Sequence, residues 1–451
     1  MRFGSFAQML DYYASVSPDS PALYYGTSVR NVCTFSELKR TVDARAAALS
    51  AEGKTCLGVF TDGSFACVVT IFAAVQAGLQ VVLLDENTPD SILPDLIRYT
   101  DIDLLWGDPD LCDELSPFLT NGVADGAHRI LFFTSGTTDR SKAVVLTDGS
   151  LMASAYNGGA MLPLSPSDTL LCMLPLSHVF GFVCGLLWGL SMGAAVALGR
   201  GARHYADDCA FFHPTALSAV PLLWGFLLKY RAINPELKLV LIGAGDCPKA
   251  LLDAAKALGA RIAFGYGLTE TSSGVALSTV GDPMAMAICP GDTITIAPDG
   301  EVLIAAPTCM MQGYYKRDAD TKAVLQNGIL RTGDLGFLDA QNRLHITGRK
   351  KEILVLSDGT KLFLPEYERA CATALETDEL CIVLLDDIPT LVLGNQSRGD
   401  ERAVLEQLAS ILSERPRGQQ LKKVLFYEKP LPRTATGKIK RWELQREVET
   451  A

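Results

Sequence analysis

The sequence is poor in positive charge and has no paired-cysteine motif, and each shortage excludes a class of protein. Lysine and arginine number 40 against 51 aspartate and glutamate residues, which gives a formal charge of −11. Proteins that wrap nucleic acid usually carry a basic excess, so we expect no nucleic-acid partner. The twelve cysteines are scattered without a Cys-x-x-Cys pair. This pattern is typical of reduced, mostly buried thiols and not of a disulfide framework or a zinc site.

Internal repeats and low-complexity tracts are also lacking. The segment MRFGSFAQMLDYYASVSPDS has no long apolar core, so we expect no secretory signal. Hydrophobic residues make up 48% of the chain and charged residues 20%, which leaves ample material for buried cores. The length of 451 residues corresponds to roughly two to four domains. These features predict a soluble, acidic, cytoplasmic protein, and an enzyme.

Residues 179–199 form a run of 21 residues without a charge, which is long enough to span a bilayer. Its glycines recur at every fourth position, at Gly181, Gly185, Gly189 and Gly193. That spacing matches the GxxxG motif of membrane helices. The alternative is a buried helix from about Phe180 to Met192 followed by a strand, Ala194–Ala197. We favour the alternative and expect no transmembrane segment, because the run is rich in glycine and the sequence has no second span.

Short β-rich apolar runs alternate with helical patterns through about the first 300 residues. The candidate strands are Leu57–Thr61, Val81–Leu84, Ile130–Thr134, Leu237–Ile242 and Arg261–Phe264. This alternation predicts an α/β fold, with a large N-terminal domain of βαβ sheets whose functional loops follow the strands. From about residue 290 to 345 the pattern becomes short strands with glycine turns, such as Glu301–Ala305, which predicts a β-rich subdomain.

After the run GRKKE at residues 348–352 the pattern changes to that of a compact α+β domain. The candidate elements are helices at about Tyr367–Leu375 and Glu401–Glu414, and strands at Cys381–Leu385, Leu391–Leu393 and Lys423–Tyr427. We therefore expect an N-terminal domain at 1–348 and a small C-terminal domain at 349–451, with a hinge in Gly348–Glu352.

Four motifs carry residues suited to nucleotide chemistry. The first is LFFTSGTTDRSK at Leu131–Lys142, where a buried strand ends in small and hydroxyl residues followed by a lysine. Such a loop can turn backbone N–H groups and hydroxyls towards a polyphosphate, with Lys142 as a point charge. It is not a Walker A loop, because the GK[ST] ending is absent. Taken alone, the motif is more often a polar turn with a solvated lysine than a phosphate loop.

The second motif is FGYGLTET at Phe264–Thr271. The glycines around Tyr266 let the backbone approach a flat ligand on which the ring can stack. Thr269 and Glu270 offer oxygen ligands to a phosphate-bound Mg²⁺. The alternative is a glycine turn with a surface glutamate.

The third and fourth motifs are LRTGDL, with Asp334, and PRTATGKIK at 432–440. Asp334 and Arg349 could both reach ribose hydroxyls, and the lysines of the fourth motif suit an anion. The alternatives are a strand-end aspartate, a surface arginine and a basic tail.

Together, in this order and spacing, the four motifs resemble the adenylate-forming (AMP-binding) superfamily, in its acyl-CoA synthetase branch. The resemblance extends from Phe35–Leu38 to Gly437–Lys438 and includes two further segments. LPLSHVFG at Leu174–Gly181 is similar to the segment beside the family's acyl pocket, and GYYK at Gly313–Lys316 is similar to its GYY element. The resemblance implies that a carboxylate attacks the α-phosphate of ATP to give an acyl-adenylate, from which a thiol then displaces AMP.

The resemblance also implies roles for individual residues. The β- and γ-phosphates would be held by Thr134, Ser135, Gly136, Thr137, Thr138 and Lys142. Adenine would lie between the Gly243-Ala244-Gly245 turn and Tyr266, with Gly265, Gly267 and Thr269 beside it. Glu270 would hold Mg²⁺, Asp334 and Arg349 would bind ribose, and Lys438 would contact the reacting carboxylate and α-phosphate. The catalytic residues would be Lys438, Glu270 and Thr269.

In this family the small domain is mobile and rotates between the two steps, about a residue that corresponds to Lys351. The loop Leu356–Lys361 would then help to form the tunnel for the thiol, with Gly359 giving room. The phosphate loop departs from the family pattern TSGTTGxPKG at Asp139, Ser141 and Ala143. A carboxylate about 4 Å from a triphosphate would cost on the order of 1–4 kcal/mol.

The segment Ser177–Phe180 bears on which acid is the substrate. Near this segment, the peptide-synthetase domains that activate α-amino acids normally carry an aspartate. Its absence favours a carboxylic acid without an amino group, and leaves fatty, aryl and short branched acids open. His178, Phe180 and Gly267 would line the acyl pocket, although His178 could equally be a core histidine. The acceptor would be coenzyme A or a separate acyl carrier protein. The alternatives from other classes are a regulatory nucleotide-binding protein without turnover and a membrane transporter.

Overall fold

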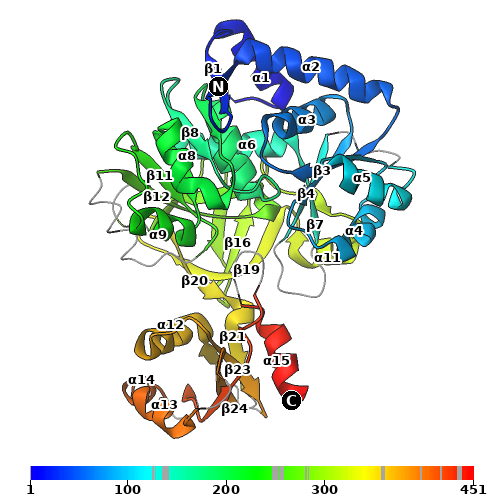
Figure 1. The fold of residues 1–451 in the computed structure, drawn as a ribbon. Coiled ribbons are helices and arrows are strands. Elements are labelled where there is room, and N and C mark those ends of the chain that lie inside the picture. Colours follow the sequence, from blue (N-terminus) through cyan, green and yellow to red (C-terminus); the bar gives the residue numbers. More distant parts are fainter. Residues whose placement is uncertain are drawn as a thin grey trace.

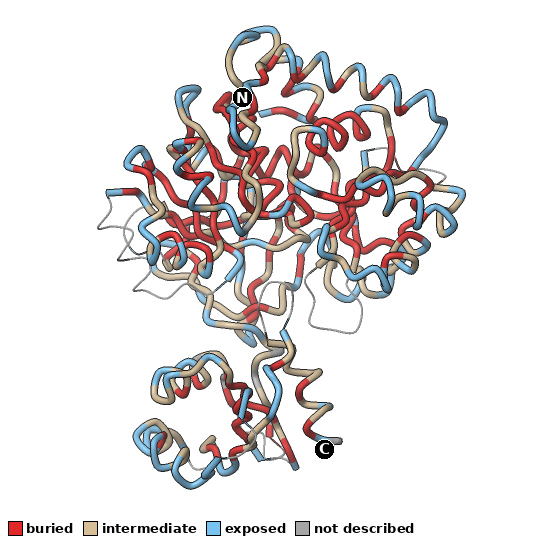
Figure 2. The backbone as a smooth tube through the Cα atoms, viewed as in Figure 1, coloured by how far each residue is buried: buried red, intermediate tan, exposed pale blue. Residues whose placement is uncertain are grey.

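The computed structural model describes residues 2–450 except 124–125, 127, 135–141, 246–252, 254–258, 280–281, 283, 357–360, 387, 397–398, 417–418 and 434–438. Residues 2–349 form a large lobe and residues 353–450 a small lobe that lies below it in Figure 1. Two hydrophobic cores fill the large lobe, and two others are built only from residues 354–448. Figure 2 shows the buried residues concentrated inside each lobe. The predicted α/β fold class is confirmed.

A six-stranded sheet in the large lobe has the order β17-β7-β6-β4-β3-β5. Its strands are β3 (Cys56–Thr61), β4 (Gln80–Asp85), β5 (Leu104–Trp106), β6 (Arg129–Phe133), β7 (Ala143–Thr147) and β17 (Gly313–Tyr314). The first four are parallel, as the βαβ pattern predicts. β7 returns antiparallel to β6, and β17 pairs antiparallel with β7. The turn between β6 and β7 is therefore the predicted phosphate loop.

A 14-stranded sheet holds most of the remaining strands of this lobe. They are β1 (Pro21–Tyr25), β2 (Asn31–Thr34), β8 (Thr169–Cys172), β9 (Ala195–Leu198), β10 (Ala216–Ala219), β11 (Leu239–Ile242), β12 (Arg261–Leu268), β13 (Ser273–Leu277), β14 (Met286–Ile288), β15 (Thr293–Ile296), β16 (Glu301–Ala305), β18 (Leu325–Gln326), β19 (Ile329–Leu338) and β20 (Arg343–Arg349). β8 to β11 pair in parallel, whereas β13 to β20 pair antiparallel.

β12 belongs to both kinds of pairing. Its first half, Arg261–Phe264, is parallel to β11, and its second half, Gly265–Leu268, is antiparallel to β13. The strand is longer than the sequence predicts, because it continues into the glycine-rich FGYG motif. The predicted β-rich segment is thus joined to the βαβ sheet by hydrogen bonds, through β12, β13 and β14.

Helices cover these sheets. They are α1 (Phe6–Val16), α2 (Phe35–Ala51), α3 (Phe65–Gln76), α4 (Leu93–Tyr99), α5 (Pro109–Leu115), α6 (Asp148–Met161), α8 (Tyr205–Phe212), α9 (Pro221–Lys229) and α11 (Asp318–Val324). Five of them, α1, α2, α3, α5 and α6, begin at a serine, threonine or aspartate side chain that caps the helix. Thr34 and Glu37 form a capping box at the start of α2, and Thr147 and Ser150 form one at α6. α6 follows β7 directly and therefore begins at the opposite end of this strand from the predicted phosphate loop.

The charge-free run folds as a core helix and strand. It forms a π-helical segment, η3 (Gly181–Leu187), then α7 (Trp188–Ser191), a turn at Gly193 with φ of +74°, and β9. Phe182 packs against Phe6 and Phe132, with ring centroids 6.0 and 5.6 Å apart. Across the described part of the chain, no helix is long and apolar enough to cross a membrane. The preference for a buried helix over a membrane span is confirmed.

The small lobe contains two sheets and four helices in the described residues. Its elements are η6 (Lys350–Glu352) at the junction, β21 (Ile353–Val355), β22 (Lys361–Phe363), α12 (Leu364–Leu375), β23 (Leu380–Leu385), β24 (Ile388–Leu393), α13 (Glu401–Gln407), α14 (Ala409–Ser413), β25 (Lys423–Phe426) and α15 (Arg441–Thr450). The prediction of a single helix at Glu401–Glu414 is wrong in one respect. The segment forms two helices divided at Leu408, which is fully buried in a core shared with β24 and β25.

The described cysteines are all free, and all but Cys112 and Cys184 are buried. Among the described residues, no group of histidine, cysteine, aspartate and glutamate side chains could hold a metal ion by itself. The free, mostly buried cysteines agree with the prediction of reduced thiols.

Asp292, between β14 and β15, makes the stability of the fold pH-dependent. Burial raises its pKa to about 7, and Arg2 and Asn157 lower it only in part. The folded protein therefore binds an extra proton between about pH 4 and pH 7, and loses stability as the pH rises through this range. Asp292→Asn is expected to raise the melting temperature at pH 8 and to change it little at pH 4.5. An equal rise in melting temperature at both pH values would show that Asp292 is not the source of this pH dependence.

Candidate functional site

The ends of the predicted phosphate loop meet in a tight neck. The Thr134 N–H donates to the Lys142 carbonyl at 2.9 Å, and the Lys142 N–H donates to Thr134 Oγ1 at 3.2 Å. The antiparallel pairing of β6 with β7 brings these residues together. Ser135, Gly136, Thr137 and Thr138, with Asp139 and Ser141, lie outside the described residues.

Lys142 and Glu270, which belong to different motifs, meet at Tyr314. The Lys142 ammonium lies 4.5 Å from the centre of the Tyr314 ring, and 3.5 Å from Asp320 Oδ1. The Tyr314 hydroxyl donates to Glu270 Oε1 at 2.7 Å. Burial, with the neighbouring Glu270 charge, raises the pKa of Tyr314 well above its usual range. Tyr314 is therefore a neutral donor between a cation and a carboxylate.

Backbone pairing fixes the position of Tyr314. β17 is antiparallel to β7, with Tyr314 opposite Val144, two residues after Lys142. The Met311 N–H, just before β17, donates to the Glu270 carbonyl at 2.8 Å. The GYYK segment was recognised in the sequence, but no role was predicted for Tyr314. Its role depends on a pairing between strands about 170 residues apart, which no local pattern reveals.

A second cluster joins Tyr266, Asp334 and Arg349. The Tyr266 hydroxyl donates to Asp334 Oδ2 at 2.7 Å, and Arg349 Nε lies 2.8 Å from Asp334 Oδ1. Asp334 is opposite Arg349 in the β19–β20 pairing, which explains their contact. The Asp334 carboxylate is buried, and the Arg349 side chain is half exposed. Burial and the Asp334 charge raise the pKa of Tyr266 far above its usual value.

One continuous segment connects the two clusters. Tyr266 lies in β12, and Thr269 and Glu270 lie in the 3₁₀ turn η5 (Thr269–Thr271) that follows it. Gly267 is required by the approach of β13, since a Cβ atom there would lie 1.8 Å from the Ser273 carbonyl oxygen. Gly265 likewise faces Leu277 of β13, at 2.9 Å. Close packing against β13 therefore explains why both positions are glycine.

The predicted adenine turn follows β11. The Gly243 N–H donates to the Ala219 carbonyl at 3.2 Å, and Ala244 adopts a φ of +61°. A Cβ atom on Gly243 would lie 3.0 Å from Cζ of Phe180, so the ring of this predicted acyl-pocket residue packs against the turn.

His178 lies close to Phe180 and is largely buried. Burial lowers its pKa, and the Asp85 carboxylate offsets part of this effect. Asp85 in turn accepts a hydrogen bond from Ser177 Oγ at 2.7 Å. His178 is therefore a neutral side chain near pH 7, available as a hydrogen-bonding group.

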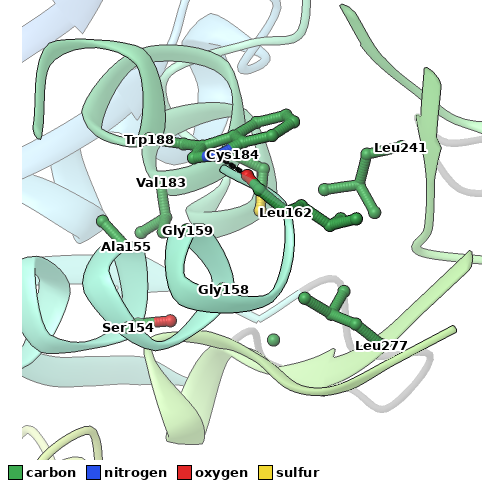
Figure 3. Close-up of a pocket in the computed structure, with 11 residues that line it drawn as sticks. Ser154, Ala155, Gly158, Gly159, Leu162, Val183, Cys184, Trp188, Leu241 and Leu277 are labelled. Atoms are coloured by element: carbon green, nitrogen blue, oxygen red, sulfur yellow. Dashed lines mark hydrogen bonds between the residues drawn. The ribbon is translucent and has the colours of Figure 1, made fainter. Parts of the chain in front are cut away.

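An apolar cavity lies between α6, η3, α7, β11 and β13 (Figure 3). It is lined by Ser154, Ala155, Gly158, Gly159, Leu162, Val183, Cys184, Trp188, Leu241, Gly274 and Leu277. None of the three predicted acyl-pocket residues is in this set, although η3 continues directly from Phe180. The small residues at helical spacing along α6, Ser154, Ala155, Gly158 and Gly159, were the available sequence signal, and it was missed.

Residues predicted in the small lobe and at the hinge are described only in part. Lys438 and Gly359 lie outside the described residues, and Lys351 lies in η6. Its neighbour Lys350 is anchored to the large lobe, with Nζ 2.6 Å from Asp299 Oδ2 and 2.7 Å from Glu301 Oε2. Glu301 is almost fully buried and also pairs with Arg331. No motif in the sequence predicted this anchor.

The two clusters bring together residues that the sequence predicted separately: Lys142 with Glu270, and Tyr266 with Asp334 and Arg349. Residues 120–315 match the family described as AMP-binding enzyme. Oxalate–CoA ligase of Arabidopsis thaliana is 30% identical, over 76% of this chain and 71% of that protein. 2-Succinylbenzoate–CoA ligase of Bacillus cereus is 28% identical, over 71% of this chain and 70% of that protein.

Two solved structures share the fold over nearly their whole length. O-Succinylbenzoate coenzyme A synthetase (MenE) from Bacillus subtilis, in complex with AMP, has a TM-score of 0.83 at 21% identity, covering 97% of this chain and 98% of that one. ATP-bound MatB from Rhodopseudomonas palustris has a TM-score of 0.84 at 21% identity, covering 100% and 99%. The chain belongs to the AMP-binding enzymes, in their acid–CoA ligase branch.

These findings confirm the predicted family and enzyme class, an AMP-forming acid–CoA ligase that activates a carboxylic acid with ATP. They also agree with the predicted ATP, Mg²⁺ and coenzyme A. One MenE structure contains ATP and a magnesium ion, and the curated relatives are CoA ligases.

Proposed function

We propose that this ligase forms its acyl-adenylate where the Lys142–Tyr314–Glu270 and Tyr266–Asp334–Arg349 clusters meet, along β12 and η5. The observation that carries the proposal is Tyr314, which links the Lys142 cation to the Glu270 carboxylate through contacts of 4.5 and 2.7 Å. Lys142, predicted for the phosphates, and Glu270, predicted for the metal, thus contact the same side chain. Lys142 supplies positive charge to the β- and γ-phosphates.

Glu270 fits the metal site that the family implies. Its Oε1 accepts the Tyr314 hydroxyl, which orients the carboxylate and leaves the lone pairs of Oε2 for a cation. Mg²⁺ is usually held by one or two carboxylates together with phosphate oxygens, so Glu270 with Thr269 would be a sufficient protein contribution. When bound, Mg²⁺ neutralises charge on the phosphates.

At the other end of the nucleotide, Asp334 accepts hydrogen bonds from ribose hydroxyls and Arg349 holds the carboxylate in place. The Tyr266 ring and the Gly243–Ala244 turn flank adenine. The acid's carboxylate oxygen attacks the α-phosphate, and pyrophosphate leaves. Catalysis then consists of positioning and charge stabilisation, because little covalent chemistry is required from the protein.

We also propose that residues 1–348 and 349–451 act as two domains, with the small one rotating about Lys351. The Lys350–Glu301 anchor supports Lys351 as the pivot, since it fixes the residue before it to the large lobe, and it favours a boundary two residues later, after Lys350. In one orientation Lys438 meets the charge developing at the reacting carboxylate. In the other, Gly359 lines the thiol tunnel. The acceptor is coenzyme A in preference to a separate carrier protein, and the enzyme acts in the cytoplasm.

The test is exchange of labelled pyrophosphate into ATP across fatty, aryl and short acids, with Lys438→Ala beside the wild type. Exchange with one class of acid is expected, and its loss in Lys438→Ala by more than about 10²-fold, because a cation aimed at developing charge is removed. Lys423→Ala, at an exposed position of β25, is the control and should exchange normally. Coenzyme A and a carrier protein are then compared as acceptors. ATP binding without exchange for any acid would favour the regulatory alternative.

A further inference from the structure

Glu301 lies near the junction of the two lobes, although its side chain is shielded from solvent. It is the first residue of β16, which pairs with β19, and β19 and β20 run to the end of the large lobe that faces the small one (Figure 1). The residue is only 3% exposed. A buried carboxylate needs cations and N–H groups as partners, so the partners of Glu301 show what it holds in place.

The first oxygen of this carboxylate holds the turn that presents Asp334. The pairing of β16 with β19 leaves a bulge in β19 between Arg331 and Leu335. Within the bulge Gly333 adopts a φ of +71°, and its N–H donates to Glu301 Oε1 at 2.9 Å. Bulges change the direction in which nearby side chains point. Glu301 therefore fixes the backbone immediately before the predicted ribose contact.

The second oxygen holds two cations. Lys350 Nζ lies 2.7 Å from Glu301 Oε2, and Arg331 Nη2 lies 2.5 Å from the same atom. Burial raises the pKa of Glu301, but the hydrogen bonds from Lys350 and from the Gly333 N–H outweigh this effect and lower the pKa overall. Glu301 is therefore an anion near pH 7. Asp299, the other partner of Lys350, is exposed.

Arg349 and Lys350 are consecutive, and a different buried carboxylate of the large lobe holds each of them. Arg349 pairs with Asp334, and Lys350 pairs with Glu301. Since Glu301 also holds the turn before Asp334, the ribose contact and the last anchored residue of the large lobe share one carboxylate. The first residue of this run at which the backbone can turn without breaking either pair is therefore Lys351.

We propose that Glu301 is a positioning residue that couples the ribose site to the pivot: its Oε1 keeps Asp334 directed at ribose, and its Oε2 confines the rotation of the small domain to Lys351. This inference rests on the proposed function, because it takes Asp334 as the ribose contact and Lys351 as the pivot. Without the anchor, the rotation spreads to Arg349 and disturbs its contact with Asp334. Thioester formation, the step that follows the rotation, is then the step that slows most.

The test measures pyrophosphate exchange and thioester formation separately, with the acid that the exchange assay selects. Lys350→Met keeps a long side chain but removes its charge. It should slow acyl transfer from the preformed adenylate to coenzyme A about 10-fold more than it slows exchange, within the usual range of coupling between two sites. Glu301→Gln should change this ratio equally, because the amide can still accept from Gly333 but lacks the charge that holds Lys350.

Glu301→Ala tests the other oxygen, because it also removes the acceptor for the Gly333 N–H. In addition to the change in ratio, it should raise the KM for ATP by about 10-fold, as expected for the loss of a hydrogen bond to a charged acceptor. Glu301→Gln should leave this KM within about 2-fold of the wild-type value, since its amide oxygen replaces that acceptor. The same KM in both variants would overturn the role of Oε1.

Asp299→Asn is the matched control. It neutralises the exposed partner of Lys350, and its amide oxygen can still accept the Glu301 N–H. Both rates should stay within about 2-fold of the wild type, because exposed ion pairs contribute little. Lys350→Arg restores a cation and should recover most of the lost transfer rate.

A double variant, Glu301→Gln with Lys350→Met, shows whether the two residues act through one contact. It should be no slower in acyl transfer than either single variant, since each change removes the same ion pair. Additive losses in the double variant, or equal slowing of exchange and transfer in Lys350→Met, would overturn the proposal, because a merely structural role would produce those results.

Limited proteolysis by a glutamate-specific protease separates this inference from the proposed function, because it requires no turnover. Glu352 follows the pivot in η6, and cleavage after it reports how readily the junction opens. Cleavage should be about 5-fold faster in Lys350→Met than in Asp299→Asn. This difference in a protein without exchange would retain the anchor and refute the ligase activity. Exchange and thioester formation with an unchanged ratio and unchanged cleavage would do the reverse.

Discussion

Glu270→Gln is expected to reduce pyrophosphate exchange by about 10²–10³-fold, the largest loss among the described residues. The amide keeps the size of the side chain and can still accept from Tyr314, but it lacks the negative charge that holds Mg²⁺ beside the phosphates. The measurement is exchange against Mg²⁺ concentration. The KM for Mg²⁺ should rise, and excess Mg²⁺ should restore part of the activity.

Tyr314→Phe and Tyr315→Phe make a matched pair of controls for this result. Tyr314→Phe removes the donor to Glu270 and should cost about 10-fold in exchange. The Tyr315 hydroxyl donates to Asp101 at 2.6 Å, in the second core of the large lobe, so Tyr315→Phe should lower the melting temperature and leave exchange intact. Full activity of Glu270→Gln at low Mg²⁺ would remove Glu270 from the metal site.

Asp334→Asn is expected to raise the KM for ATP by about 10–100-fold and to change kcat less. The buried carboxylate accepts from Tyr266 and pairs with Arg349, and hydrogen bonds to a charged acceptor contribute about 1.5–3 kcal/mol each. The neutral amide loses the ion pair, so the ribose contact and the position of Arg349 weaken together. ATP titrations of the exchange reaction measure both parameters.

Asp339→Asn is the control for this change. Asp339 lies in the turn of the same β19–β20 hairpin, where it pairs with Arg343 at 2.8 Å and with His345 at 3.1 Å. Loss of the contacts with Arg343 and His345 should lower the stability of the hairpin but leave the KM for ATP unchanged. If both variants raised the KM equally, Asp334 would be acting through the stability of the hairpin and not through contact with ribose.

The sequence predicted elements whose pattern is local, and it missed relationships between distant strands. Strands such as β3 and β4 were predicted within a residue or two at each end, because they are continuous apolar runs between turn residues. The extension of β12 to Leu268 was missed, because its glycines disfavour a strand and only pairing with β13 makes one. The division of the helix at Leu408 was missed because its apolar face is continuous.

In the candidate site, too, residues in local motifs could be predicted and contacts between distant segments could not. Each motif supplied its own residues, so Lys142, Glu270, Tyr266 and Asp334 could be chosen from the sequence and the family resemblance. Tyr314 and Lys350 could not, because their importance comes from partners far away in the chain.

The change of partner along β12 has a mechanical consequence. Because one strand is hydrogen-bonded to β11 in its first half and to β13 in its second, the βαβ part and the β-rich part cannot slide or open against each other without breaking that strand. The 14-stranded sheet therefore ties its βαβ part and its β-rich part into one cooperative unit. The groups on β12 and η5 stand on a rigid base, and movement of the small lobe can leave their alignment unchanged.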